Sequence, residues 1–145
     1  MFFIKSIIAG FSGAATLTIL HQYLKENTTN APRMDLLGLQ LLEEGIKELE
    51  IERPAHLYQK AMLADLAVNT LYYGLGLAAS KQKIMRGTCL GLAAGVGAVV
   101  LPKHIGLKKE YSSRNDKTRV LTVALYTAGG LAAGIVASLL SRTKK

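Results

Sequence analysis

The chain has 145 residues, of which 18 are lysine or arginine and 10 are aspartate or glutamate, so its formal net charge is +8, and half of its residues are hydrophobic. The basic residues stand beside apolar runs without interleaved aromatic side chains to stack on bases, which favours anionic lipid over nucleic acid as their partner. With Cys89 as its single cysteine, the chain can form neither an internal disulfide nor a cysteine-based zinc site.

Four apolar runs dominate the sequence. They are residues 6–24, 61–80, 87–102 and 120–141. Crossing about 30 Å of hydrocarbon takes roughly 20 helical residues, so three runs are long enough and the third is about a turn short. A single domain of this size has too little interior to hide four such helices. We therefore expect one membrane domain over residues 1–145: an all-α, polytopic integral membrane protein with about four transmembrane helices and one amphipathic surface helix.

The first run predicts a transmembrane helix over about residues 2–24. Its beginning, MFFIKSIIAGFSGAA, has the early charge and the small residues of a signal peptide. We expect it instead to stay as the first span, with Lys5 reaching back to the membrane interface.

A helix is expected over about residues 35–52, within the polar connection that follows. Asp35 stands where a residue can cap the first turn, and Pro54 would end the helix. Apolar residues recur on one face, at Leu39, Leu42, Ile46 and Leu49. Acidic residues recur on the other, at Glu43, Glu44 and Glu48. An acidic face matches anionic lipid poorly, so we expect a solvated acidic surface, with docking of a basic partner as the alternative.

The second span, over about residues 61–80, carries a carboxylate. Asp65 is followed on the same helical stripe by Asn69 and Tyr72, with Tyr73 beside them. An acid within the membrane costs about 2.5–3.5 kcal/mol on insertion scales, so it tends to face protein or water and to mark function. We take these four residues, together with His21 from the first span, as a candidate intramembrane polar site, with Asp65 hydrogen-bonded across the bundle. The structural alternative is an interfacial Asp65 near a helix start.

The third and fourth spans are expected over about residues 85–102 and 119–141. Each carries glycines at fourfold spacing, which permit close helix packing within a bilayer: Gly87, Gly91 and Gly95 in the third, Gly130 and Gly134 in the fourth. The third segment is short enough to be re-entrant instead. Four spans place both termini on one side, and the lysine and arginine count weakly favours the two long connections as cytoplasmic. The predicted location is a bacterial inner membrane or an equivalent one.

No catalytic or metal-binding template is found, because the histidines are far apart and have no ligand spacing. We expect no catalytic residues, no metal and no cofactor. The expected function is a structural or accessory module that self-associates through its glycine faces, with the lipid bilayer, a second copy or another membrane protein as partners. One alternative is a small dimeric proton- or cation-coupled transporter or channel that uses Asp65 and Asn69. Another is a membrane-embedded enzyme with Glu43, Glu44 and a histidine brought together at the mouth.

Overall fold

The computed structural model describes residues 2–142, and these fold into six α-helices and one short 3-10 helix without a β-strand. The elements are α1 (Phe2–Asn27), α2 (Met34–Glu48), α3 (Leu57–Ala78), α4 (Lys83–Val100), η1 (Pro102–His104), α5 (Glu110–Ser113) and α6 (Asp116–Arg142). The all-α prediction is confirmed. Periodicity and span length were sufficient for it, because each predicted span coincides with a helix of 18 residues or more.

Three helices of the described chain are long and apolar enough to cross a membrane: α1 from Phe3 onward, α4 and α6. The count of four spans is therefore not confirmed. The helix that falls short is α3, whose length of 22 residues is sufficient but whose apolar sequence is interrupted by Asp65 and Asn69.

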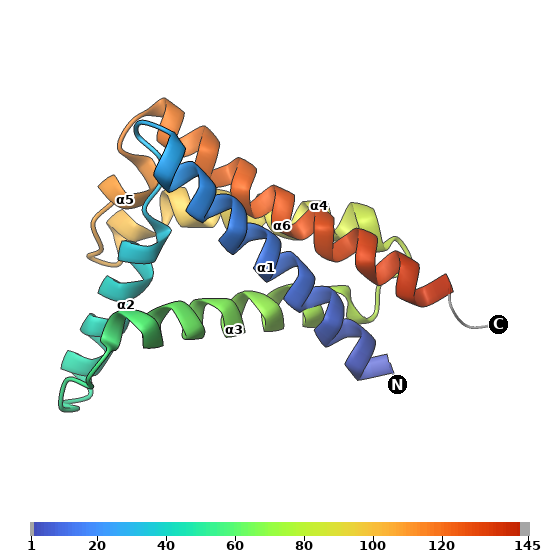
Figure 1. Ribbon diagram of the computed structural model, residues 1–145, viewed down its shortest axis with the longest axis horizontal. Coiled ribbons are helices and arrows are strands. Elements are labelled where there is room, and N and C mark those ends of the chain that lie inside the picture. The colour runs from blue at the N-terminus through green and yellow to red at the C-terminus, as the bar shows by residue number, and fades with distance from the viewer. Residues whose placement is uncertain (1, 143–145) are drawn as a thin grey trace.

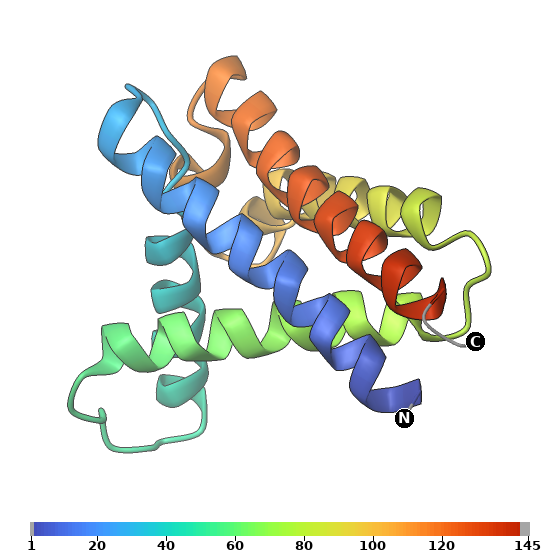
Figure 2. The ribbon, with the colours of Figure 1, turned by 45° about the vertical axis from the view of Figure 1, so that its right-hand side comes forward.

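The four long helices form a wedge (Figure 1). The beginning of α1 crosses the second half of α3, where Gly10 of α1 lies against the backbone of Thr70 and Gly74. From this crossing the two helices diverge, and α2 lies across the gap between them, as both ribbon views show (Figure 2). The most extensive helix contact is between α4 and α6, and α6 also packs along α1.

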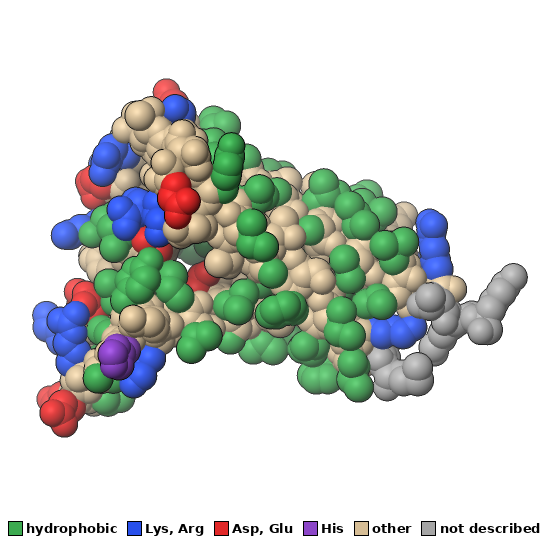
Figure 3. All heavy atoms as spheres, in the orientation of Figure 1, with side chains coloured by type: hydrophobic (Ala, Val, Ile, Leu, Met, Phe, Trp, Pro, Cys, Tyr) green, Lys and Arg blue, Asp and Glu red, His purple; other side chains and the backbone are tan. Residues whose placement is uncertain are grey.

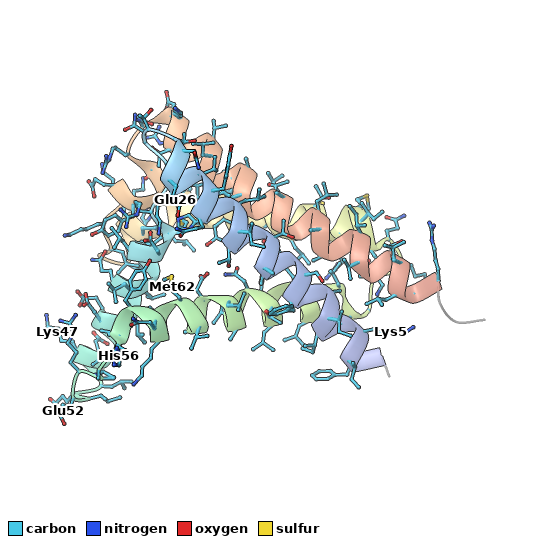
Figure 4. The ribbon with its side chains drawn as sticks, viewed as in Figure 1. Lys5, Glu26, Lys47, Glu52, His56 and Met62 are labelled. Carbon is cyan, nitrogen blue, oxygen red and sulfur yellow. The ribbon has the colours of Figure 1, made fainter. Side chains whose placement is uncertain are left out.

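The wedge has a narrow end and a wide end. The beginning of α1, the end of α6 and the turn between α3 and α4 lie at the narrow end, whereas α2, η1 and α5 lie at the wide end. On the face shown in Figure 3, charged side chains gather at the wide end, hydrophobic ones cover the middle, and a few basic ones reappear at the narrow end. Figure 4 places Lys5 at the narrow end and Lys47, Glu52 and His56 at the wide end.

Basic residues bind helix ends at the narrow end. Lys83 Nζ donates to the carbonyl oxygens of Leu77 (2.6 Å) and Ala78 (3.1 Å), which are among the last of α3. Lys5 Nζ donates to the Leu140 carbonyl of α6. These carbonyls lie in the last turns of their helices, where a cation interacts favourably with the negative end of the helix dipole. Lys5 thus bridges α1 and α6 in addition to its expected interfacial position.

The helix that we predicted as an amphipathic surface helix differs from its predicted bounds. It begins at Met34, so Asp35 lies in the first turn and does not cap it. It ends at Glu48, well before Pro54, because Glu50 adopts a left-handed conformation (φ 53°). The Ile51 amide then donates to the Ile46 carbonyl (3.0 Å) and the Glu50 amide to Lys47 (3.2 Å), the two bonds of a Schellman motif. Glycine usually marks such a helix end, but this position is occupied by Glu50, so the sequence did not indicate that α2 ends here.

The core is divided between the two ends. Ala9, Tyr73, Leu77, Ala133 and Ala137 form one cluster, at the crossing of α1, α3 and α6. The second joins α2 to the bundle and contains Leu17, Met34, Leu37, Leu107 and Tyr126. The buried face of α2 is therefore not the predicted stripe, whose last member, Leu49, is 71% exposed.

Candidate functional site

Asp65 is half-buried in the third turn of α3, and Asn69 is buried one turn later. The Asn69 Nδ2 donates to the backbone oxygen of Asp65 (2.9 Å) and to its carboxylate Oδ1 (3.1 Å). This spacing is what an i, i+4 pair on one helix face provides. The hydrogen bond lies within α3, whereas we expected Asp65 to be bonded across the bundle.

The two tyrosines after Asn69 connect α3 to different neighbours. Tyr73 is fully buried and its hydroxyl donates to the Tyr126 carbonyl of α6 (2.9 Å). The Tyr72 hydroxyl donates to the Leu90 carbonyl of α4 (2.9 Å). Their rings meet edge to face, with centroids 5.3 Å apart. Both hydroxyls are thus engaged with backbone, and the pair acts as a structural link between helices.

A cavity of about 450 Å³ lies inside the wedge, and we call it the wedge cavity. Its walls come from α2, α3, α4, η1 and α6, and include Leu37, Ala94, Ala98 and Tyr126. Asp65 and Tyr72 line it as well, and Asp65 is the one charged side chain among its described lining residues. The face in Figure 3 is hollowed beside α2, between α1 and α3.

A second hollow, the α2–α3 groove, has a volume of about 380 Å³. Leu42 and Ile46 of α2 face Ala61 and Val68 of α3 across it. Asp65 lines this groove too, again as the one charged side chain among the described lining residues. The carboxylate therefore lies where two apolar hollows meet.

His21 belongs to a different group from the one predicted. It is buried on α1, with Nε2 3.1 Å from the Pro32 carbonyl oxygen and 3.8 Å from Asp35 Oδ1. It lines neither hollow beside Asp65. Of the five residues of the predicted polar site, the structure brings Asp65 and Tyr72 to the wedge cavity and places Asn69 against Asp65.

Asp35 is the centre of a cluster that the sequence did not reveal. Its side chain is 2% exposed and lies between α1, α2 and α3. Arg33 binds it through Nε and Nη2 at 2.9 Å each, and the Tyr58 hydroxyl of α3 donates to it at 3.0 Å. Lys25 Nζ of α1 lies 3.5 Å from Oδ2. These partners lie on separate elements that only the fold brings together. The local sequence around Asp35 therefore suggested a helix cap and not this cluster.

The electrostatics of this cluster favour an ionised Asp35. Burial acts to raise the pKa of Asp35, but the hydrogen bonds from Arg33 and Tyr58 and the nearby positive charge outweigh it and hold the pKa well below its usual range. The hydrogen bond to Asp35 likewise raises the pKa of Arg33. The cluster thus clamps the wide ends of α1 and α3 to the start of α2.

The acidic surface of α2 is open to solvent. Glu44 and Glu48 are exposed, and Glu43 pairs with Arg53 at 2.7 Å. No histidine is found among the described residues that line the depression around Glu43 and Glu44. Within residues 2–142 no group of three His, Cys, Asp or Glu side chains is arranged to hold a metal ion. The geometry for the enzymatic alternative is not assembled in the described chain.

The predicted packing glycines lie between α4 and α6. A Cβ at Gly87 would collide with the backbone of Gly130 and Gly134, and one at Gly91 with the backbone of Tyr126 and Thr127. Gly95 likewise lies against the backbone of Val123. These glycines therefore face each other within a single chain, which leaves them unavailable for contact with a second copy.

The chain was compared with protein-family models, with curated proteins and with solved structures, and none of the three comparisons gave a match. What the protein does therefore has to be inferred from its own residues.

Proposed function

We propose that this protein is an integral membrane module without enzymatic chemistry, in which α1, α3, α4 and α6 all cross the bilayer. The observation that carries this proposal is a belt of exposed, large apolar side chains on all four helices. Among them are Phe11 of α1, Leu63 of α3, Val96 of α4 and Leu139 of α6, each 48–67% exposed. A soluble monomer rarely exposes apolar surface so extensively. The belt lies between two ends that carry charge (Figure 3).

The place of α3 as a fourth span is supported by its length and by the direction of its polar groups. Its 22 residues rise about 33 Å, enough to cross the hydrocarbon layer. Leu63, Val68 and Leu75 are 59–67% exposed, whereas Asp65 lines the interior hollows. An acid turned toward the protein avoids most of the penalty that it would meet in lipid. The interruption of the apolar sequence of α3 by Asp65 and Asn69 is thus compatible with a transmembrane position.

The partners that we propose are the bilayer and a second copy or another membrane protein. Because the glycine faces are occupied within the chain, such a partner needs another surface. The outer face of α6 offers a shallow hollow with small side chains, Ala124, Thr127 and Ala128. Small residues permit the close approach that holds helices together in lipid. Chemical cross-linking of residues on this face of α6 tests whether a partner binds there. Ala128→Phe is the variant that should block the contact.

Carbonate extraction of membranes tests the module proposal. The protein should stay in the membrane pellet at alkaline pH and should require detergent for purification, because its apolar belt has no other cover. A chain that is released by carbonate and is monodisperse without detergent would contradict it.

A second candidate function is a small proton- or cation-coupled transporter or channel. It is favoured by one observation, that Asp65 is the charged residue at the junction of two hollows and is held by Asn69. Asp65→Asn preserves shape but removes the titratable group. In proteoliposomes this variant should fold normally and abolish a pH-dependent flux. Wild-type vesicles without such a flux would remove this candidate while leaving the module proposal intact.

A further inference from the structure

Asp65 and Asp35 are two carboxylates of one chain in opposite electrostatic situations. Asp35 has Arg33, Lys25 and His21 within 4 Å of its oxygens. Asp65 accepts its side-chain hydrogen bond from the neutral amide of Asn69. No lysine, arginine or histidine is found among the described residues that line either hollow around Asp65. An acid in apolar surroundings is costly unless a cation pairs with it, so this position lacks the partner that Asp35 has.

We propose that the wedge cavity binds a lipophilic organic cation, an ammonium group on a small apolar body, with Asp65 as its counter-ion. The walls match the apolar body, because the described lining residues other than Asp65 are apolar residues and two tyrosines. The volume of about 450 Å³ is within the range of small-molecule pockets. Tyr72 and Tyr126 also line the cavity, and aromatic rings attract ammonium groups.

The residues at the mouth of the wedge cavity indicate whether its ligand enters from water or from an apolar environment. Leu41 of α2 and Leu101 and Ile105 beside η1 line the cavity and are 56–59% exposed. Such a rim is unfavourable for a strongly hydrated ion, whereas a lipophilic amine partitions to the same apolar surface. Entry past these side chains leads to the carboxylate, the one charged group among the described lining residues.

Other ligand classes fit less well. An anion would meet Asp65 without a compensating cation, and a neutral hydrocarbon would leave the carboxylate without a partner. The proposal does not depend on transport, since binding requires only the cavity and Asp65. It also holds if α3 lies at the membrane surface, so the topology of α3 and the ligand are tested separately.

The test uses the full chain in a non-ionic detergent and a matched pair of fluorescent probes. Dansylcadaverine carries a primary ammonium on an apolar dansyl body, and its N-acetyl derivative is the same body without the charge. Binding is measured as the rise in dansyl emission on titration. Wild-type protein should bind the cation more tightly by about tenfold, which corresponds to about 1.4 kcal/mol. Equal affinity for the two probes, or binding of neither, would overturn the proposal.

Two substitution pairs locate the site. Asp65→Asn should remove the preference for the cation, whereas Glu48→Gln, an exposed acid of α2 that lines neither hollow, should retain it. Gly38 lines both hollows and has open space where a Cβ would stand, so Gly38→Phe should fill the cavity and weaken both probes. Gly45 lines only the α2–α3 groove and also has open space, so Gly45→Phe should bind like wild type.

Each variant is checked for its helix content and elution volume before titration. A preference that survives in Asp65→Asn would refute the role of the carboxylate. Loss of binding in Gly45→Phe but not in Gly38→Phe would refute the wedge cavity as the site. If Asp65→Asn does not fold, the probe pair on wild-type protein and the two glycine variants still decide the question.

Discussion

The close contact between α4 and α6 gives the sharpest prediction, at Gly91 of α4. A Cβ there would overlap the carbonyl of Tyr126 and the Cα of Thr127, which are backbone atoms and cannot rotate away. Gly91→Ala must therefore push α6 from α4. Gly97, on the same helix, is the matched control, because its Cβ would meet only the end of Leu101 at 3.6 Å.

The magnitude follows from two opposing effects. Replacing glycine by alanine in a helix gains up to about 1 kcal/mol of unfolding free energy, and both variants share this gain. Overpacking a tight contact loses about 1–3 kcal/mol, and only Gly91→Ala has this loss. The difference between the two variants should thus be about 1–3 kcal/mol. For a chain of this size, that corresponds to roughly 3–10 °C in melting temperature. Gly91→Leu should lose more than Gly91→Ala.

The assay is thermal unfolding in detergent, followed by circular dichroism at the helical minimum. Gly97→Ala should melt at or above the wild-type temperature and Gly91→Ala below it. Leu92→Ala, which trims a side chain that is 48% exposed, should change the melting temperature less than Gly91→Leu. Equal melting temperatures for Gly91→Ala and Gly97→Ala would refute the close packing of α4 on α6.

Three further predictions concern the wide end of the wedge. In chemical denaturation, Asp35→Asn should lower the unfolding free energy by about 2–3 kcal/mol, because it leaves Arg33 and Lys25 unpaired but within reach of water. The control Asp116→Asn, at an exposed ion pair, should change the unfolding free energy by less than about 1 kcal/mol. Because the pKa of Asp35 is lower in the folded state than in the unfolded state, its contribution to stability is present above about pH 4 and is lost as the pH falls below that. The melting temperature should therefore drop more steeply on acidification in wild-type protein than in Asp35→Asn. Glu50→Gly should raise the melting temperature slightly, since glycine takes the left-handed conformation without strain, and Glu50→Val should lower it.

The helices themselves follow from the sequence because their signal is local. The four apolar runs became the long helices α1, α3, α4 and α6, and the glycines at fourfold spacing fell at the contact between α4 and α6. Both patterns depend on residues within one segment, whose spacing fixes the face on which they lie.

The polar sites required information that the sequence does not carry locally. The partners of Asp35 come from α1, from the segment before α2 and from α3, at separations of 2 to 23 residues, so only the fold brings them together. His21 was assigned to Asp65 because both lie in apolar runs, but α1 and α3 diverge toward the wide end, where His21 lies beside Asp35 instead. We expected Asp65 to form a hydrogen bond across the bundle, but its carboxylate accepts a hydrogen bond from Asn69, one turn away in the same helix. The position of Asp65 between two hollows depends on how α2 lies across the wedge.

The central claim, a module in which α3 is a fourth membrane span, is tested most directly by the accessibility of single cysteines. In a Cys89→Ala background, Thr29→Cys, Lys81→Cys and Lys109→Cys place one thiol each at exposed positions before α2, between α3 and α4, and before α5. In sealed vesicles a membrane-impermeant maleimide should label positions 29 and 109 from the same side and position 81 from the other. Labelling of 29 and 81 from one side, with 109 on the opposite side, would mean that α3 does not cross and would contradict the four-span module.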